Sequence, residues 1–581
     1  MLSLLNKTWS IATPAPNRVQ ELVQELGVPP VIGELLVNRN IRTAEEGRSL
    51  VNRDLTKLHD PFLMAGMREA VDRIVRAINT EESITVFTDY DVDGVSSAAF
   101  LTHFFRDLGV NVNYYLPDRM KEGYGLNTDA VRKIRRKGST LLITADCGIT
   151  CVREIEIANE IGLDVIVSDH HQVGKNGLPA AVAVLNPHQP LCQYPYRFLS
   201  GVGIVFKLAT ALRGELYRSG WDKARLPNLK RHLDLFVLGT IADVAPLTGE
   251  NHILSSHGLD VISASSKPGV VALKEVARVD GKVTSRSVGF ALGPRLNAAG
   301  RMGKADAGLH LLTATDLNEA KALARTIDQI NLDRREVQAG TLEEAEYLIG
   351  REMDLDRVIV LASENFHQGV IGIVASRLAD KYYRPTVLIS LDENGHGKGS
   401  GRSIPKFNLF KALSECSGFF TQFGGHAYAA GLSMEKKNIP AFKEAVNEIG
   451  RRILCEDDLI PELKIDSVLD LSEINRELFK NIQALEPFGA ENPVPVFLSS
   501  RVHIQNLRTM GKDKNHVRFK AIQEGGYIDV VGFNLGDTFA SLDLEEGPVD
   551  IAYEIQVNDW NGQDKVELRL LDVRKTMPEE S

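Results

Sequence analysis

The sequence has few cysteines and no long apolar stretch. Five of its 581 residues are cysteines, and the nearest two, Cys147 and Cys151, lack the C-x-x-C spacing of redox motifs and zinc sites. The cysteines therefore fit reduced thiols, which are the rule in a cytoplasm. The apolar runs are too short to cross a bilayer, and residues 1–7 lack the basic and apolar regions of a signal peptide. We expect a cytoplasmic protein without a membrane-spanning segment.

An excess of positive charge is also missing. The net charge is −10, which argues against a general affinity for polyanions. Residues 501–520 differ, because they carry six basic side chains and only one acidic side chain, Asp513. This local basic surface is compatible with nucleic-acid binding, although an exposed hairpin with solubilising charge gives the same pattern. Hydrophobic residues make up 43% of the chain and charged residues 25%, as in ordinary globular proteins, and the length corresponds to about three to four domains.

Acidic residues and histidines follow several short apolar segments at the point where a predicted strand or helix ends. The segments and the residues after them are 84–88 with Asp89 and Asp91, 141–145 with Asp146, 165–168 with Asp169, His170 and His171, and 233–241 with Asp243. In open parallel α/β sheets, ligands bind at the carboxyl ends of the strands. A single Asp in such a place can be a turn former. Four such segments together indicate a metal site.

The predicted ligands also indicate which metal would bind. They are mostly carboxylates, with one or two imidazoles and no cysteine pair nearby. Hard oxygen donors favour Mg²⁺ or Mn²⁺ over a structural zinc ion. There are more carboxylates than one ion needs, which suggests two ions about 3.5–4 Å apart that share a ligand. Two such ions would activate a water molecule and offset the charge that develops at a phosphorus centre.

The sequence pattern of the first part of the chain predicts small helices followed by a parallel α/β domain. We expect an N-terminal helical segment over residues 1–75 and an α/β domain over 76–304. From about residue 80 to 190, short β-branched strands alternate with helices, which is the pattern of a doubly wound parallel sheet. Residues 305–352 lack Pro and are rich in Ala, Leu, Glu, Lys and Arg, which predicts a long connecting helix.

The rest of the chain predicts a second α/β domain over 353–455 and a β-rich domain over 460–575. The second α/β domain has predicted strands at 358–361 and 386–389, a helix at 371–382, and glycine-rich loops at 397–403 and 424–426. Several short, regularly spaced strands after residue 460 suggest a small barrel of the oligonucleotide-binding (OB) type, an architecture that binds single strands. The expected fold class is α/β, with two α/β lobes joined by a long helix and a C-terminal OB-like barrel.

Several motifs resemble those of DHH phosphoesterases, a superfamily named after the triplet Asp169-His170-His171. The strand-end motifs D-x-D, D-C-G, D-H-H and A-D-V match it in order, and G-S-G-R-S at 399–403 and G-G-H at 424–426 resemble its DHHA1 partner domain. Further blocks are similar to the RecJ family of single-strand-specific exonucleases: G-T-I-A-D-V-A-P-L at 239–247, G-P-R-L-N-A-A-G-R-M at 293–302, H-Q-G-V-I-G-I-V-A-S-R-L at 367–378 and L-E-P-F-G-A-E-N-P at 485–493. The resemblance runs from about residue 55 to the C-terminus. Val92 stands where the family often has Ala, which is a mild departure.

The resemblance implies roles for individual residues. The implied metal ligands are Asp89, Asp91, Asp146, His170 and Asp243, with Asp146 bridging two Mn²⁺ or Mg²⁺ ions. The implied catalytic residues are Asp146, Arg402 and His171. His171 would lie beside the scissile phosphate and not on a metal ion. The implied substrate-binding residues are Ser400, Arg402, His426, Arg295 and Asn297. Arg295 and Asn297 could equally be structural residues of a turn. Asp93 and Asp169 are expected to orient the ligands.

The resemblance also implies an activity and partners. The implied activity is 5′→3′ hydrolysis of single-stranded DNA to 5′-mononucleotides, in DNA recombination and repair. The alternative is a DHH phosphodiesterase of short oligonucleotides or cyclic dinucleotides, but such relatives are usually shorter and lack the β-rich C-terminal part. A non-catalytic DNA-binding scaffold is disfavoured, because every expected ligand position is filled. The implied partners of a monomeric enzyme are single-stranded DNA, a single-strand-binding protein and a RecQ-type helicase.

Overall fold

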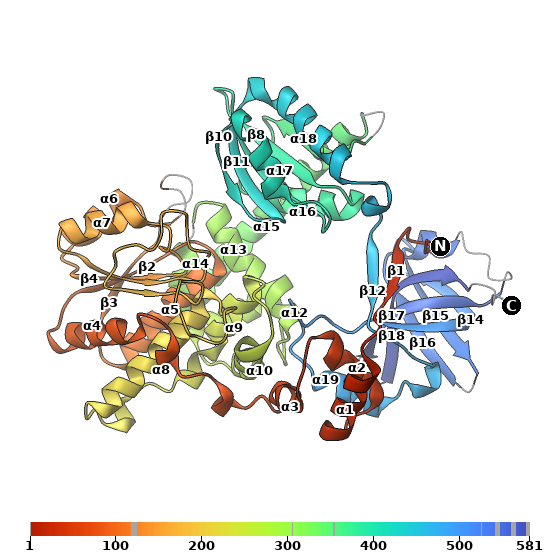
Figure 1. Ribbon diagram of the computed structural model, residues 1–581, viewed down its shortest axis with the longest axis horizontal. Helices are drawn as coiled ribbons and strands as arrows, with labels where there is room; N and C mark the ends of the chain where they lie inside the picture. Colours follow the sequence, from red (N-terminus) through yellow and green to blue (C-terminus); the bar gives the residue numbers. More distant parts are fainter. Residues whose placement is uncertain are drawn as a thin grey trace. The chain divides into compact units, whose positions relative to one another are not determined.

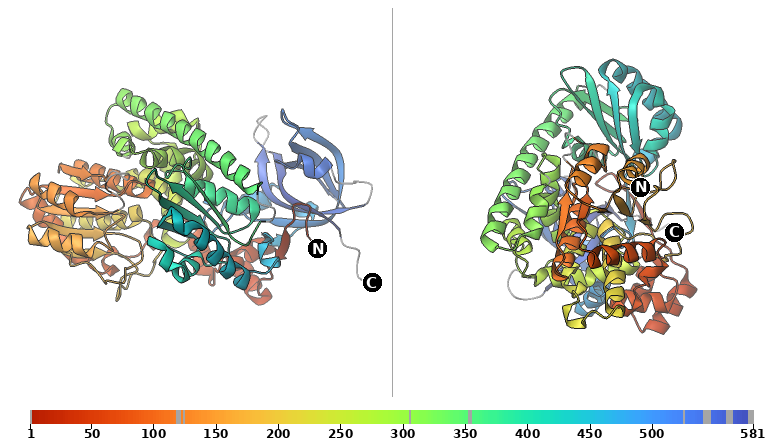
Figure 2. Two further views of the ribbon diagram at one scale, coloured as in Figure 1. Left: turned by 90° about the horizontal axis from the view of Figure 1, so that it is seen from above. Right: turned by 90° about the vertical axis from the view of Figure 1, so that its left-hand side faces the viewer.

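The computed structural model describes residues 2–117, 122, 125–304, 306–351, 355–524, 526–540, 547–558 and 565–576. They form two compact units. The first unit contains Ile41–Leu332 and Ala484–Val494, and the second contains Met1–Asn40, Asp333–Gln483 and Pro495–Ser581. The long helix α15 (Leu317–Ile349) runs from the first unit into the second, as predicted for a connecting helix (Figures 1 and 2). None of the described helices is long and apolar enough to cross a membrane.

The first unit is built around a parallel five-stranded sheet in the order β3-β2-β4-β5-β6. Its strands are β2 (Ile84–Thr88), β3 (Val112–Tyr115), β4 (Leu141–Ala145), β5 (Asp164–Ser168) and β6 (Ala183–Leu185). All residues of β2 and β4 are buried, which explains why both read as unbroken apolar runs. The order reverses between β2 and β4, so the carboxyl ends of these two strands form the crevice where open α/β sheets bind ligands.

Helices cover both faces of this sheet, which confirms the doubly wound prediction. Val86, Ile143 and Ile166 face an apolar cluster shared with α4 (Met67–Asn79), α5 (Val92–Asp107) and α8 (Gly201–Arg218). Leu142 and Val165 face another cluster, shared with α6 (Thr128–Arg136) and α7 (Val152–Glu160), on the opposite side of the sheet in Figure 1. Alternate residues of each strand therefore bury opposite faces.

A helical layer completes the first unit. Its helices are α3 (Ala44–Asn52), α9 (Leu233–Ala242), α10 (Gly249–Ser263), α11 (Pro268–Ala277), α12 (Ser285–Ser287), α13 (Gly293–Arg301) and α14 (Asp306–Thr313). Residues 484–494 return to this layer from far along the chain. The backbone N–H of Leu247 donates to the carbonyl of Ala490 at 2.8 Å, and Nε2 of His252 lies 3.1 Å from the carbonyl of Leu485. The predicted domain bounds stay predictions, but the compact units are not continuous in sequence.

The second unit contains a mixed sheet in the order β10-β11-β9-β8-β7. The strands are β7 (Ile359–Ser363), β8 (Thr386–Leu391), β9 (His396–Arg402), β10 (Phe420–Gly425) and β11 (Ala429–Glu435). The helices are α16 (Ile371–Tyr382), α17 (Leu409–Glu415) and α18 (Ile439–Ile453). The helix predicted at 371–382 has the same bounds in the structure.

The prediction of glycine-rich loops at 397–403 and 424–426 is wrong, because most of these residues belong to β9 and β10. Gly397, Gly399 and Gly401 alternate along β9 and are all buried. A Cβ atom at Gly399 would lie 2.6 Å from a methyl group of Leu432, and one at Gly401 would lie 2.7 Å from a methyl group of Leu409. These glycines therefore let neighbouring side chains pack directly against the backbone of the strand.

The C-terminal part of the second unit is a closed barrel, as predicted. Its five long strands are β14 (Phe497–Met510), β15 (His516–Gln523), β16 (Gly526–Gly532), β17 (Val549–Asn558) and β18 (Lys565–Lys575). They pair in the order β14-β15-β16-β18-β17, and pairing of β17 with β14 closes the barrel. The short strand β13 (Ser467–Val468) pairs in parallel with the first residues of β14. Helices α19 (Arg476–Gln483) and α20 (Gly536–Ala540) complete this part.

The N-terminal residues join the second unit. Besides the expected helices α1 (Pro16–Leu26) and α2 (Pro30–Asn38), they contain an unpredicted strand, β1 (Thr8–Ile11). β1 pairs in parallel with β12 (Glu462–Ile465), a segment far along the chain. The indole N–H of Trp9 also donates to Oδ2 of Asp572 at 2.9 Å. The start of the chain is thereby tied to the segment that leads into the barrel.

Candidate metal centre

The five predicted metal ligands lie at one edge of the parallel sheet. Asp89 and Asp91 follow β2, and Asp91 caps the N-terminus of α5. Asp146 follows β4, His170 follows β5, and Asp243 caps the C-terminus of α9. The carboxyl ends of β2 and β4 meet where the strand order reverses, so the fold itself brings these residues together.

The ligand atoms are close enough to share metal ions. Oxygens of Asp89, Asp91 and Asp146 lie within 4.8 Å of one another. Nε2 of His170 is 3.0 Å from Oδ1 of Asp146 and 3.8 Å from Oδ2 of Asp243. Asp146 thus belongs both to the group with Asp89 and Asp91 and to a group with His170, which is the position expected of a bridging ligand.

The carboxylates of this cluster disfavour one another's negative charge. Burial and the neighbouring charge of Asp91 hold the pKa of Asp89 well above its usual range, and burial and Asp93 do the same for the pKa of Asp146. Burial, followed by Asp93 and Asp91, raises the pKa of Asp243 to about 8. Buried carboxylates with these pKa values call for a positive charge among them.

The hydrogen bonding and protonation of individual ligand atoms also fit a metal ion. Oδ1 of Asp146 and Nε2 of His170 are buried and face each other at 3.0 Å, and neither forms a hydrogen bond with any other described residue. Burial, and then the charge of His171, lower the pKa of His170 to about 4, so its imidazole is neutral and can donate an electron pair. Oxygen donors with one neutral imidazole suit Mg²⁺ or Mn²⁺.

Glycines allow other elements to approach the acids closely. A Cβ atom at Gly201 would lie 2.6 Å from Oδ1 of Asp146, and one at Gly239 would lie 2.5 Å from Oδ1 of Asp93. A Cβ atom at Gly94 would collide with Oδ1 of Asp89. Sequence analysis missed Gly201 and Gly239. The sequence feature that could have indicated Gly201 is the G-V-G run directly after Ser200, the residue whose side chain caps α8.

Asp93 connects the cluster to the start of α8. Its carboxylate accepts hydrogen bonds from the backbone N–H groups of Gly201 at 2.6 Å and Val202 at 3.0 Å. Oδ2 of Asp93 is also 3.9 Å from Nε2 of His170. Asp93 therefore holds the helix that contacts Asp146, which agrees with the expected orienting role, and it lies within reach of a metal ion as well.

His171 is held by Asp169. Oδ1 of Asp169 accepts from the backbone N–H of His171 at 3.0 Å and lies 2.7 Å from Nδ1 of the same residue. Oδ2 of Asp169 accepts from the backbone N–H of Ile149 at 2.9 Å. Burial opposes a charge on His171, but the hydrogen bond and the charge of Asp169 outweigh it and raise the pKa of His171 to about 9. Asp169 therefore favours the protonated form of His171.

Ser400, Arg402 and His426 lie in the second unit. Ser400 and Arg402 alternate with the buried glycines of β9, so they share its other face. Nη1 of Arg402 donates to Oγ of Ser400 at 3.2 Å and to the carbonyl of Gly401 at 2.8 Å, and burial lowers the pKa of Arg402. His426 is exposed and directly follows β10. The phosphate-binding roles of these three residues stay predictions.

Arg295 and Asn297 lie on α13 and make contacts within the first unit. Nε of Arg295 donates to Oδ1 of Asp328 at 2.8 Å, and its Nη1 donates to the carbonyl of Ala291 at 2.8 Å. Oδ1 of Asn297 accepts from the backbone N–H of Val92 at 3.2 Å. Asn297 therefore supports the turn that carries Asp91. These contacts favour the structural alternative for Arg295, and the substrate-binding roles of both residues stay predictions.

Comparison with known proteins agrees with this geometry. Residues 83–240 match the model of the DHH family, N-terminal domain, residues 355–451 match the DHHA1 domain, and residues 465–572 match the RecJ OB domain. The single-stranded-DNA-specific exonuclease RecJ of Bacillus subtilis (strain 168) is 40% identical over 571 residues, which are 97% of this chain and 70% of that protein. The crystal structure of RecJ in complex with Mn²⁺ from Thermus thermophilus matches with a TM-score of 0.84 at 30% identity, covering 98% of this chain and 80% of that chain.

A second relative is matched over nearly its whole length. The single-stranded-DNA-specific exonuclease RecJ of Escherichia coli (strain K12) is 35% identical over 555 residues, which are 93% of this chain and 95% of that protein. The similarity thus includes both α/β lobes and the barrel. With the strand-end cluster in place and all three domain models matched, the chain belongs to the RecJ family.

Proposed function

We propose that this chain is a metal-dependent exonuclease that hydrolyses single-stranded DNA in the 5′→3′ direction and releases 5′-mononucleotides. The observation that carries the proposal is the partly buried cluster of carboxylates around Asp146 and His170 at the edge of the parallel sheet. The relatives from Bacillus subtilis and Escherichia coli are named as single-stranded-DNA-specific exonucleases, and the Thermus thermophilus relative binds Mn²⁺ in its crystal structure.

The cluster can hold two divalent ions. Asp89, Asp91 and Asp146 would hold one ion, and Asp146, His170 and Asp243 would hold the other. When bound, two such ions lower the pKa of an attacking water molecule and offset negative charge on the phosphoryl oxygens. Asp93 keeps the start of α8 against Asp146 and so fixes the position of the shared ligand.

His171 would act on the phosphate. Asp169 engages Nδ1 of the imidazole, and Nε2 would donate to a phosphoryl oxygen of bound DNA. The hydrogen bond and the charge of Asp169 raise the pKa of His171, which favours the protonated, donating ring. A donor held in this way stabilises charge that develops during phosphodiester cleavage.

The second unit would bind the strand. Ser400, Arg402 and His426 would hold nucleotide phosphates, with Arg402 adding a donor during cleavage, because guanidinium groups match phosphate geometry. The barrel would bind bases and backbone of a single strand, since β14, β15 and the turn between them carry the basic residues of 501–520. In a cell, a RecQ-type helicase and a single-strand-binding protein would supply the substrate to a monomeric, cytoplasmic enzyme acting in recombination and repair.

The test uses one long single-stranded DNA that is labelled separately at its 5′ and 3′ ends and incubated with Mn²⁺, Mg²⁺ or EDTA. The proposal predicts immediate release of 5′-labelled mononucleotide, delayed loss of the 3′ label, and no release in EDTA. Early release of the 3′ label would contradict the polarity. Survival of the long strand while short oligonucleotides are degraded would instead establish the phosphodiesterase alternative.

A further inference from the structure

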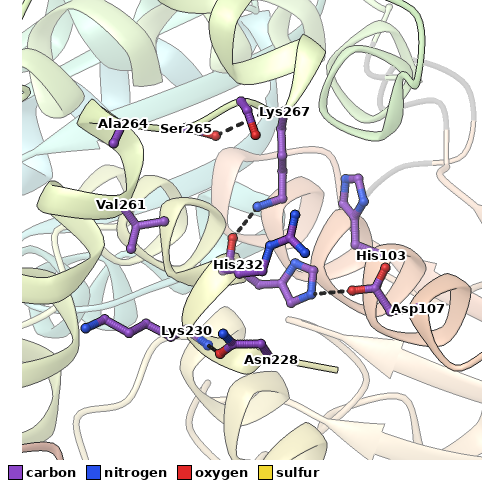
Figure 3. A pocket seen from close by; sticks show the side chains of 11 residues that line it. His103, Asp107, Asn228, Lys230, His232, Val261, Ala264, Ser265 and Lys267 are labelled. Atoms are coloured by element: carbon purple, nitrogen blue, oxygen red, sulfur yellow. Dashed lines mark hydrogen bonds and ion pairs between the residues drawn. The ribbon is translucent and has the colours of Figure 1, made fainter. Parts of the chain in front are cut away.

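The described part of the first unit has a cavity of about 400 Å³ away from the metal centre (Figure 3). Its wall includes His103 and Asp107, near the C-terminal end of α5, whereas Asp91 of the metal centre caps the other end of that helix. An α-helix of 16 residues is about 24 Å long. The cavity is therefore a separate site on the same domain.

The wall of this cavity is positively charged. Lys230, Arg231 and Lys267 line it, and Asp107 is the one acidic residue among its described lining residues. Nζ of Lys267 forms an ion pair with Oδ1 of Asp234 at 2.8 Å, and this pair balances the positive charge of Lys267. Lys230 and Arg231 are exposed and form no ion pair within the described parts of the chain. The cavity thus has two uncompensated cations on a protein whose net charge is −10.

Two histidines add polar atoms to the wall. His232 stacks on His103 with ring centroids 5.9 Å apart, and Figure 3 shows both rings beside Lys267. Nε2 of His232 is 3.2 Å from Oδ2 of Asp107. His232 is only 3% exposed, and its Nδ1 has no hydrogen-bond partner among the described residues. Burial and the charge of Lys267 lower the pKa of His232 to about 3, as expected in a positive environment.

The start of a helix also faces this region. Lys267 is the N-cap of α11, which has 10 residues, and no side chain caps that helix. The N-terminus of a helix carries partial positive charge and favours anions. The lysine and arginine charges and the helix start favour a negatively charged ligand.

We propose that this cavity binds a phosphate group, carried either by a free mononucleotide or by the backbone of single-stranded DNA. Lys and Arg side chains are the residues that bind phosphates most strongly. A cavity of this size can also hold the rest of a mononucleotide. The site does not depend on the metal centre, so it can be tested without turnover.

The experiment measures binding of deoxyadenosine monophosphate to the full chain in EDTA, by calorimetry. The variant Lys230→Gln/Arg231→Gln removes both uncompensated charges and leaves the Lys267–Asp234 pair intact. If the ligand is a free nucleotide, the variant should lose one equivalent of binding sites or bind at least about tenfold more weakly. The variant Lys230→Arg/Arg231→Lys keeps both charges and should retain binding. Both positions are exposed, so the melting temperature should stay unchanged.

A second arm tests the DNA backbone as the source of the phosphate. The affinity for an oligothymidylate of about 20 nucleotides is measured against salt concentration, again in EDTA. Loss of two backbone contacts in Lys230→Gln/Arg231→Gln should reduce the salt slope by about 1.4, since each contact to a single strand contributes about 0.7. The control Lys223→Gln/Lys282→Gln removes two exposed charges elsewhere in the same unit. The proposal would be overturned if Lys230→Gln/Arg231→Gln and Lys223→Gln/Lys282→Gln reduced the salt slope equally. It would also be overturned if Lys230→Gln/Arg231→Gln changed neither nucleotide binding nor the salt slope.

Discussion

Single glycines determine how closely the acidic residues of the metal centre can be packed. Gly201, the first residue of α8, lies against Asp146. We predict that Gly201→Ala weakens Mn²⁺ binding at least about tenfold, because the new methyl group would displace the shared ligand. Calorimetric titration of the metal-free chain with Mn²⁺ measures this.

The matched control is on the same helix. A Cβ atom at Gly214 would meet nothing within 4 Å. Gly214→Ala should leave Mn²⁺ binding unchanged and stabilise the chain by about 0.5–1 kcal/mol, because alanine favours a helix. Equal Mn²⁺ affinities of the two variants would show that Gly201 does not position Asp146.

A second residue-scale prediction concerns Glu82, at the opposite end of the sheet. Burial opposes its charge, but hydrogen bonds from Thr140, Arg73 and Thr80 outweigh burial and lower the pKa of Glu82 to about 2. Nη2 of Arg73 is 2.6 Å from the Glu82 carboxylate, and the Arg73 side chain is 5% exposed. At pH 7, Glu82→Gln should lower the free energy of unfolding by about 1–3 kcal/mol.

The pH dependence of this effect follows from the sign of the shift. The folded-state pKa is below the unfolded value of 4.5, so the contribution of Glu82 is complete above pH 4.5 and is lost as the pH falls toward 2. Urea unfolding between pH 7 and pH 3 should show wild type and Glu82→Gln converging as the pH falls. A constant difference would mean that the carboxylate charge is not what stabilises the fold.

At the scale of elements, strand β9 depends on its glycines. Gly399→Ala would place a methyl group 2.6 Å from Leu432, and overpacking of this kind costs about 1–3 kcal/mol. We therefore expect a lower melting temperature for Gly399→Ala. The control Lys398→Ala changes the exposed face of the same strand and should alter the stability by less than about 0.5 kcal/mol. Equal melting temperatures for the two variants would argue against close packing on β9.

The same strand shows what sequence reasoning could and could not predict. Strands β2 and β4 were predictable because a buried parallel strand is a continuous apolar run that ends in an acidic residue. β9 was not, because its buried positions carry no side chains and therefore no hydrophobic pattern. The pairing of β1 with β12 was missed because it joins segments that are distant in sequence.

The metal centre shows a similar division. The gathering of its acidic residues and histidine at one edge of the sheet was predictable from the strand-end motifs, since those motifs fix both residue type and position on the sheet. The contact of Gly201 with Asp146 and the hydrogen bonds from the start of α8 to Asp93 were not predictable, because they depend on how α8 returns to the sheet.

At the scale of the whole molecule, metal binding should stabilise the first unit. The cluster brings together buried carboxylates that raise one another's pKa, and a cation removes this unfavourable interaction. At a Mn²⁺ concentration of about 100 times the dissociation constant, the stability should increase by about 2.7 kcal/mol. Calorimetric melting should therefore show a transition that shifts upward by several degrees in Mn²⁺ relative to EDTA. An unshifted thermogram would contradict the assignment of the cluster as a metal site.

The most direct test of the account is the initial rate of 5′-label release from single-stranded DNA at saturating Mn²⁺. Asp146→Asn keeps the size of the shared ligand but removes its charge, and Asp260→Asn makes the same change at an exposed position of α10. The account predicts a rate lower by on the order of 100-fold or more for Asp146→Asn, with unchanged folding, and a normal rate for Asp260→Asn. A near-normal rate for Asp146→Asn would contradict the claim that this cluster is where the phosphodiester bond is cleaved.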